Sequence, residues 1–168
     1  GRLLEPADFP AEGAPPASVP APGLDDPAAI LFTSGTTGRV KGAVLSHRNL
    51  ITGLTLVEMA GAMVLHNIAA QYGLDPQAIL AQQPQHASLL VFPLFHISGL
   101  ASGFLSPMLA GGKIVLLRRW NAEEALKLVA REKITALSGV PTMLWDILNC
   151  PALGQHDVSS LTNLSSGG

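Results

Sequence analysis

The sequence predicts an α/β fold in which helices flank a largely parallel β-sheet. Residues 111–137 give the clearest observation, because a turn, a β-like run, a helical run and a second β-like run follow at a spacing that implies parallel neighbours. The apolar runs at 28–32 and 89–92 give a second observation. Each has the length of a buried strand and precedes an apolar stretch of helical length.

The N-terminal part of the chain predicts an arm, a strand, a loop and a long helix. Residues 1–27 hold seven of the thirteen prolines and are expected to form an extended arm or linker. We expect a strand over Ala28–Phe32 that leads into a glycine-rich loop. The hydroxyl of Ser46 can cap the next helix, and the helix is expected to continue to about Gln71.

The central part predicts a loop, a strand and an apolar helix. Residues 73–87 are rich in glutamine and include an Asp-Pro pair, which favours a loop with a short helical piece. A strand is expected near Leu89–Phe92, and an apolar helix from about Gly99 to Leu109.

The C-terminal part predicts the strand–helix–strand unit itself. Lys113–Leu117 is β-like, and Asn121 is suited to cap a helix over 122–132, whose apolar residues recur at helical spacing. Ile134–Leu137 returns as a strand, and Pro141 suits the first turn of a further helix.

The composition indicates a chain that hides more surface than a free-standing domain does. Charged residues make up 13% of it against roughly 25% in typical soluble domains. Hydrophobic residues reach 48%, and no Asp, Glu, Lys or Arg occurs between Asp75 and Lys113. We therefore expect a fragment whose apolar surface is covered by the remainder of a longer protein. Oligomerisation through that surface is the alternative.

A membrane is the competing explanation for this apolar character. Residues 87–112 are long enough to cross a bilayer, but prolines and glycines interrupt them every few residues, which favours a strand, a turn and a short helix. At most a peripheral membrane contact is expected. The net charge of −2 gives no reason to expect nucleic acid. The single cysteine, Cys150, permits no internal disulfide and fits a reducing compartment, so a cytoplasmic location is expected.

The run TSGTTGRVKG at residues 33–42 carries the strongest chemical signal. Its glycines let the backbone approach an anion with converging N–H groups, and its hydroxyls add short donors. Arg39 and Lys41 add positive charge that neutralises a bound phosphate. The run does not fit the Walker pattern, because Lys41 precedes Gly42 instead of following the last glycine. It predicts a loop that binds a nucleotide or pyrophosphate.

The amino-acid sequence of this run resembles the signature of the adenylate-forming enzymes. The resemblance covers FTSGTTGRVKG at 32–42 and LSHRNL at 45–50. The family includes the acyl-CoA and aryl-CoA synthetases, the luciferases and the adenylation domains of peptide synthetases. Val40 stands where the family usually has proline, which changes the stiffness of the loop more than its chemistry.

Two further segments extend the resemblance. LVFPLFHISGL at 90–100 is similar to the family segment that places a histidine near the acyl pocket, here His96. An imidazole can donate to a carboxylate and orient it toward a phosphate. The chain ends in LSSGG, which is similar to a family strand that lines the adenine and acyl sites. Gly167 and Gly168 would begin the adenine wall.

The resemblance implies that residues 28–168 are part of the AMP-binding domain, the large N-terminal domain of an adenylate-forming enzyme, truncated at its C-terminal end. The whole enzyme would be an acid–thiol ligase, most like an acyl-CoA synthetase and including the long-chain-fatty-acid–CoA ligases. It would convert an acid and ATP into acyl-AMP and pyrophosphate, and then into acyl-CoA and AMP. Lys41 and His96 would act in catalysis. The residues implied to hold the phosphates are Thr33, Ser34, Gly35, Thr36, Thr37, Gly38 and Lys41.

The implied ligands are ATP, Mg²⁺, CoA as co-substrate and a fatty or aryl carboxylic acid. The protein ligand of Mg²⁺ is expected outside this chain, so no metal-binding residue is assigned here, and the chain alone is expected to be inactive. Two alternatives stay open. The chain could belong to another adenylation type, as in peptide synthetases or luciferases, or it could be a non-catalytic nucleotide-binding module.

Overall fold

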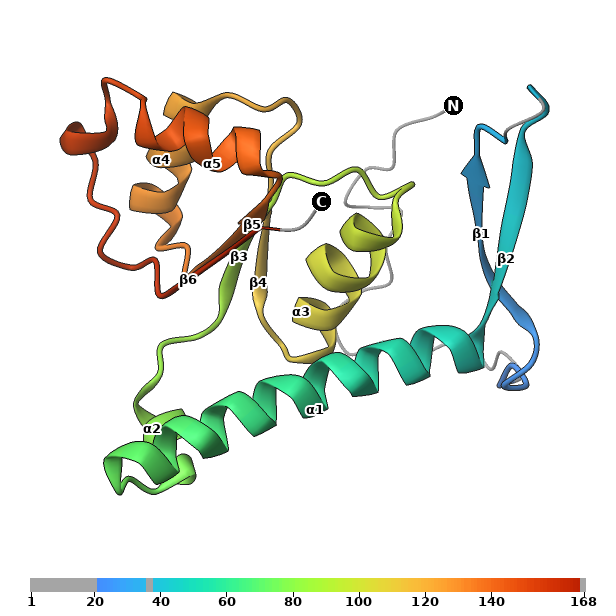
Figure 1. Ribbon diagram of the computed structural model, residues 1–168, viewed down its shortest axis with the longest axis horizontal. Coiled ribbons are helices and arrows are strands. Elements are labelled where there is room, and N and C mark those ends of the chain that lie inside the picture. Colours follow the sequence, from blue (N-terminus) through green and yellow to red (C-terminus); the bar gives the residue numbers. More distant parts are fainter. Residues whose placement is uncertain (1–20, 36–37, 167–168) are drawn as a thin grey trace, which may run out of the picture.

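A computed structural model describes residues 21–35 and 38–166 of the chain. Those residues form a two-stranded antiparallel hairpin and a four-stranded parallel sheet, with a long helix running beneath both (Figure 1). The arrangement confirms the predicted α/β class, while the predicted arm over 1–27 lies largely outside the described residues.

The hairpin joins β1 (Pro27–Thr33) to β2 (Lys41–Ser46). Their register runs from Thr33 opposite Lys41 at the loop to Pro27 opposite Ser46 at the open end. The first strand is confirmed. The second strand was not predicted, because its residues were expected to form the loop and the approach to the next helix. The glycine-rich loop is therefore the turn of a hairpin rather than a strand-to-helix connection.

The long helix α1 (His47–Tyr72) begins and ends where the sequence predicts. Ser46 and Asn49 form a capping box, since the Ser46 hydroxyl accepts from the Asn49 N–H and the Asn49 side chain accepts from the Ser46 N–H. Gly73 closes the helix in the left-handed conformation, at φ 64°. The described residues then form α2 (Pro76–Gln82), capped by Asp75.

Strand β3 (Ala87–Leu90) begins and ends two residues earlier than predicted. It pairs with β4 and β5, and the last ladder bond on it runs from the Leu117 N–H to the Leu90 carbonyl at 3.1 Å. Residues 91–97 then leave the sheet. Pairing partners, which lie far away in the sequence, decide this boundary, and the apolar run alone does not reveal them.

The predicted apolar helix is present, but most of it is a π-helix, η2 (Ser98–Leu105), followed by α3 (Ser106–Leu109). Pro107 lacks the N–H that would bond to the Gly103 carbonyl in an α-helix, which favours the wider turn before it. A side chain at Gly99 would place its Cβ 2.2 Å from the Pro93 carbonyl oxygen, so glycine allows η2 to pack against the preceding segment.

The C-terminal elements follow the predicted order. They are β4 (Lys113–Leu116), α4 (Ala122–Glu132), β5 (Ala136–Gly139), α5 (Pro141–Leu148), η3 (Leu153–Gln155) and β6 (Asn163–Ser166). Strand β5 begins two residues later than predicted, because the Ile134 N–H still bonds to Val129 across the left-handed Lys133 that ends α4. The parallel order across the sheet is β4-β3-β5-β6.

The two faces of this sheet differ in chemistry. One face packs on α4 through a core of fully buried residues, namely Ala87, Leu89, Ala125, Val129, Ile134 and Leu137. On the other face, η2 and α3 cover β3 and β4, and α1 crosses below them (Figure 1). On this second face, Ser88 and the residues of β5 and β6, namely Ala136, Ser138, Asn163 and Ser165, are small or polar, which leaves space between this part of the sheet and the helices.

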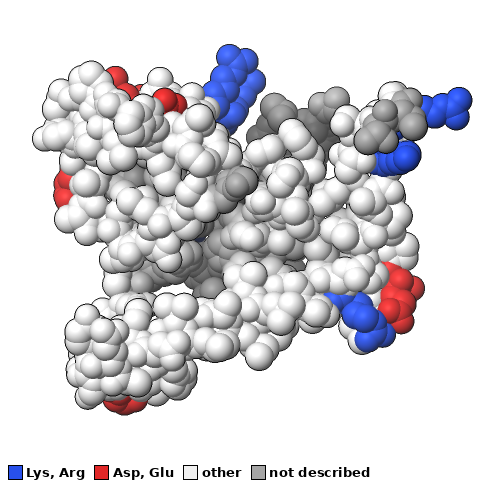
Figure 2. All heavy atoms as spheres, in the orientation of Figure 1, with Lys and Arg blue, Asp and Glu red and all other residues white. Residues whose placement is uncertain are grey.

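The apolar surface anticipated from the composition lies mainly on α1. Ala69 is its one buried residue, and side chains such as Leu56, Met63 and Tyr72 are more than half exposed. Figure 2 shows charged side chains at the periphery of the face it views, with uncharged residues across the described part of its centre. By length and composition, α1 is apolar enough to cross a membrane, although none of its most apolar window is buried in the described structure.

Candidate functional site

The glycine-rich loop is shaped by two residues with positive φ. Gly35 has φ +61° and Gly38 has φ +77°, a region that side-chain-bearing residues rarely adopt. A Cβ on Gly35 would lie 2.2 Å from the Arg39 carbonyl oxygen, whereas a Cβ on Gly38 would meet no atom of the described residues within 4 Å. Gly35 thus permits the turn to close, and Gly38 leaves open space beside the backbone. Both features suit a turn that wraps an anion.

The hairpin ladder fixes the two ends of this loop. Thr33 and Lys41 lie opposite each other, and the Thr33 hydroxyl donates to the Lys41 carbonyl at 3.4 Å. The predicted residues Ser34, Gly35 and Gly38 lie in the turn between them. The predicted phosphate-binding residues Thr36 and Thr37 fall outside the described residues, as do Gly167 and Gly168.

His96 lies in the segment that connects the carboxyl end of β3 to η2. The Ser98 N–H donates to His96 Nδ1 at 3.2 Å, so in the neutral imidazole the proton resides on Nε2. The His96 N–H bonds to Pro93, and the His96 carbonyl accepts from Leu100. The side chain is exposed. Its Nε2–H is therefore an oriented donor at the carboxyl edge of the sheet, where ligands of α/β folds commonly bind.

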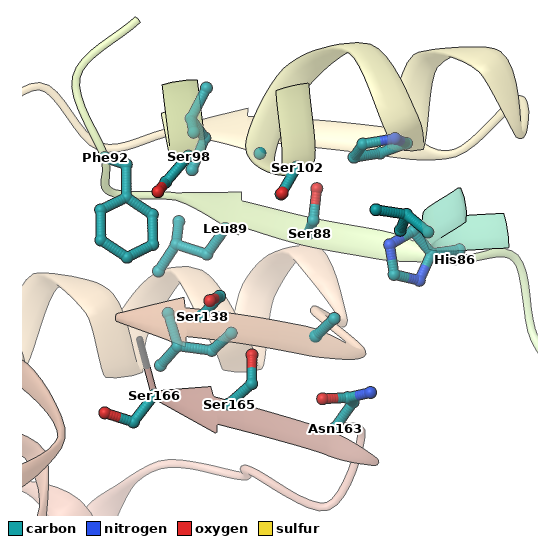
Figure 3. Close-up of a pocket in the computed structure, with 16 residues that line it drawn as sticks. His86, Ser88, Leu89, Phe92, Ser98, Ser102, Ser138, Asn163, Ser165 and Ser166 are labelled. Atoms are coloured by element: carbon teal, nitrogen blue, oxygen red, sulfur yellow. The ribbon is translucent and has the colours of Figure 1, made fainter. Parts of the chain in front are cut away.

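A cavity of about 460 Å³ lies between the polar face of the sheet and the helices (Figure 3). Its walls come from β3, β5 and β6 on one side and from η2, α3 and α1 on the other. The lining residues are Val57, His86, Ser88, Leu89, Leu90, Phe92, Ser98, Ser102, Gly103, Pro107, Ala136, Leu137, Ser138, Asn163, Ser165 and Ser166. Phe92 and Ser98 lie at one end of the cavity and His86 at the other.

The strand register explains why the sheet side of the cavity is small and polar. Ser88 pairs with Ala136, and Ala136 pairs with Asn163, so these three form one row across the strands. Two residues further on, Ser138 pairs with Ser165 and forms a second row on the same face. On the helix side, a Cβ at Gly103 would come within 2.4 Å of the Leu90 side chain, so the helix approaches the strand closely at this glycine.

A second cavity of about 360 Å³ shares His86, Ala136 and Asn163 with the first and lies beyond the amino end of β3. Thr135 Oγ1 lies beside it. This oxygen accepts from the Ala87 N–H and donates to the Ala87 carbonyl, and it lies 3.5 Å from His86 Nδ1. Because the Thr135 proton is used in the bond to the Ala87 carbonyl, Thr135 can accept from His86 only in the tautomer that carries its proton on Nδ1.

Ser165 and Ser166 of the LSSGG segment line the cavity, but the rest of its polar lining was not predicted. His96 and the loop were singled out, but Ser88, Ser102 and Ser138 were not. A signal was present, since Ser88-x-Leu90, Ala136-x-Ser138 and Asn163-x-Ser165 alternate with the period of a strand and place their small or polar members on one face. Within residues 21–35 and 38–166, no group of three or more His, Cys, Asp or Glu side chains is placed to hold a metal ion.

The model of the family described as AMP-binding enzyme matches residues 2–168, nearly the whole chain. The chain belongs to the AMP-binding enzyme family. This confirms the resemblance drawn from the loop and from the segment around His96, and it identifies the four-stranded sheet and hairpin as part of an adenylate-forming domain.

Curated relatives carry the same assignment. The chain is 35% identical to a feruloyl-CoA synthase from Amycolatopsis sp over its full length, which is 30% of that protein. It is 34% identical to the human mitochondrial medium-chain acyl-CoA ligase ACSF2 over 81% of the chain and 20% of the relative. The chain thus spans less than a third of the length of the curated relatives it matches.

A solved structure supports the fold. ATP-bound MatB from Rhodopseudomonas palustris superposes with a TM-score of 0.62 at 31% identity, over 88% of this chain and 25% of that one. The fold of this chain is therefore that of one portion of a larger adenylate-forming enzyme. The roles of the individual loop residues and of His96 remain predictions.

Proposed function

We propose that the protein containing this chain activates a carboxylic acid with ATP and transfers the acyl group to the thiol of CoA. The observation that carries the proposal is the placement of His96, whose backbone leads directly from β3 into the cavity wall. A donor at the sheet edge, two residues before Ser98 of the cavity wall, suits an acid whose carboxylate lies at that edge and whose acyl part enters the cavity. The names of the relatives, a feruloyl-CoA synthase and a medium-chain acyl-CoA ligase, support this reaction class.

The hairpin loop would hold the leaving group. Backbone N–H groups at Ser34, Gly35 and Gly38 would donate to the β- and γ-phosphates, and Lys41 would neutralise their charge. The Thr33 hydroxyl would add a donor by turning from the Lys41 carbonyl to a phosphate oxygen. Thr36 and Thr37 would add donors. Mg²⁺, when bound, supplies further charge neutralisation on the phosphates. The open space beside Gly38 and the tight turn at Gly35 support this use of the loop.

The acid would lie along β3. Its carboxylate would accept from His96 Nε2–H and be oriented toward the α-phosphorus, while Gly167 and Gly168 would form the start of the adenine wall. Most of the rate in such a reaction comes from positioning and electrostatic stabilisation. The fatty and aryl classes of acid are both represented among the named relatives. Membership of the long-chain-fatty-acid–CoA ligases remains a prediction. A cytoplasmic location also remains part of the proposal.

Acid-dependent exchange of labelled pyrophosphate into ATP by the complete protein tests the proposal. Lys41→Ala should lower the exchange rate by roughly a hundredfold, because one charged donor to a developing phosphate anion is removed. His96→Ala should lower kcat/KM for the acid by roughly tenfold or more through loss of positioning. Lys127→Ala and His66→Ala, which alter exposed helix residues elsewhere, serve as matched controls and should leave exchange unchanged.

The second candidate, a non-catalytic nucleotide-binding module, predicts a different result. The complete protein would bind ATP in calorimetry but would exchange no pyrophosphate with any acid in a panel of alkyl and aryl acids. That outcome would overturn the proposed activity. The 168-residue chain alone is expected to show no exchange.

A further inference from the structure

Among the residues that the structure describes, Ser88 is the one whose buried side-chain oxygen has no hydrogen-bond partner. It lies in the middle of the sheet on β3, is 9% exposed, and its hydroxyl makes no hydrogen bond within residues 21–35 and 38–166. Thr135, a buried polar residue directly before β5, shows the usual arrangement. Its hydroxyl bonds to both backbone groups of Ala87. A buried hydroxyl without a partner destabilises the folded chain, so Ser88 requires an explanation.

The hydroxyl of Ser88 points away from the core and toward the cavity. Ser88 follows Ala87 and precedes Leu89, which both pack on α4, so the alternation of the strand turns Ser88 to the opposite face. Figure 3 shows its side chain directed across the cavity toward Ser102 of η2. Ser88 and Ser102 both line the cavity, one on each wall.

The surroundings of Ser88 suit a ligand that carries polar atoms. The same row of the sheet ends in Asn163, and His86 stands two residues away along the chain at the far end of the cavity. A saturated hydrocarbon tail here would leave the hydroxyl of Ser88 unpaired in the complex. A ligand with a hydroxyl, ether or carbonyl group at this depth would supply the missing partner.

We infer that Ser88 is a specificity-determining residue that hydrogen-bonds a polar substituent on the acyl part of the substrate, remote from its carboxylate. The enzyme then prefers an acid that carries such a group, for example a ring hydroxyl, over the same acid without it. This inference rests on the proposed function. Discrimination of this kind is strong because the acid without the substituent leaves a buried polar group unsatisfied.

A matched pair of acids and a matched pair of variants test the inference in the complete protein. The acids are 4-hydroxycinnamate and cinnamate, which differ by one hydroxyl. The variants are Ser88→Thr and Ser88→Val, which have nearly the same volume and differ in the hydroxyl. The measurement is kcat/KM for acid-dependent pyrophosphate release. Ser159→Ala removes a serine hydroxyl from an exposed turn outside the cavity and serves as the control.

The wild-type protein and Ser88→Thr should prefer the hydroxylated acid by roughly tenfold or more, and Ser88→Val should lose most of that preference while retaining activity on cinnamate. Ser159→Ala should behave like the wild type. Equal kcat/KM of the wild type for the two acids overturns the inference but leaves the proposed function standing. So does an equal loss for both acids in Ser88→Val, which indicates a structural role. Absence of pyrophosphate release with these and all other acids overturns both.

Discussion

Two regions of the molecule, the four-stranded sheet with α4 and the hairpin with α1, differ in how far their apolar side chains are exposed to solvent. In the sheet region, Leu126, Val129 and Leu137 are at most 1% exposed. In the hairpin region, Phe32 is 69% exposed and Leu56 is 60% exposed. The first region contains a core of its own, whereas the second is held by ladder bonds and helix caps. The sheet region is therefore stabilised mainly by contacts within this chain, and the hairpin and α1 are stabilised by such contacts much less.

The largest effect that separates the two regions is expected from their leucines. Leu137→Ala should lower the free energy of unfolding by about 2–5 kcal/mol, because it opens a cavity in the core. Leu56→Ala should change it by less than about 0.5 kcal/mol in the 168-residue chain, because the side chain is exposed there. Urea unfolding followed by circular dichroism measures both. Similar losses for the two variants would contradict the comparison, and a larger loss for Leu56→Ala in the complete protein would show that α1 is covered there.

The glycine turn is the next feature to test. Gly35→Ala should lower the affinity for ATP of the complete protein by roughly tenfold or more, because the alanine Cβ would meet the Arg39 carbonyl at a positive φ. Gly38→Ala should lower the affinity for ATP by less than Gly35→Ala does, since no described atom lies close to the added Cβ. Isothermal titration calorimetry gives the affinities. If Gly35→Ala binds ATP as the wild type does, the hairpin turn is not the phosphate site.

The caps of α1 and α4 allow a finer comparison. Ser46→Ala and Asn121→Ala each remove a side chain that accepts from the first turn of a helix, a loss of about 1 kcal/mol. The loss at Asn121 should appear in the global unfolding of the sheet region, because α4 packs against its core. The loss at Ser46 should appear as faster amide exchange confined to the start of α1. Hydrogen exchange with mass spectrometry distinguishes the two, and global destabilisation by Ser46→Ala would show that α1 unfolds together with the sheet.

The smallest effect is expected from pH, because both ion pairs involved are exposed. The Lys133 ammonium and Ser159 hold the pKa of Asp157 well below its ordinary value of 3.8. A depressed carboxyl pKa stabilises the folded chain fully above about pH 3.8 and progressively less as the pH falls toward the folded value. The difference in stability between the wild type and Asp157→Asn should therefore shrink below pH 3.8.

The Asp25 carboxyl provides the matched case in the hairpin region. Arg48 lowers its pKa through a bidentate contact at 2.8 and 3.0 Å. The stability of the start of α1 should fall as the pH falls below about 3.8, and Asp25→Asn should remove this pH dependence without affecting the sheet region. Urea unfolding of the sheet region between pH 2 and 6 should respond to Asp157→Asn and be unaffected by Asp25→Asn, and the reverse pattern would contradict the separation of the two regions.

Local chemistry explains what could be predicted from the sequence. Ser46, Asn121 and Gly73 specify helix ends through hydrogen bonds within a few residues, so α1 and α4 were placed correctly. Non-local pairing explains what could not. The strand over Lys41–Ser46 follows from its register with β1, and the boundaries of β3 follow from two strands more than twenty residues away. A sequence pattern of apolar residues contains neither relation.

The candidate site divides in the same way. The loop and His96 were predicted, because residue types at short spacing identify them. The cavity was not, since it arises where Ser88, Ala136 and Asn163 become neighbours across three strands. Ser88 was not predicted, because a single serine in an apolar strand carries no signal of function in the sequence. Its missing hydrogen-bond partner is visible only in the structure.

Hydrogen bonds connect His96 rigidly to η2, which forms one wall of the cavity. His96 is bonded through its ring to the Ser98 backbone and through its carbonyl to Leu100, which both belong to η2. A shift of η2 that widens the cavity for a bulkier acid must therefore carry the imidazole with it. The width of the cavity and the direction of the His96 Nε2–H therefore change together. An acid that fits the cavity poorly would also have its carboxylate held at the wrong angle for reaction.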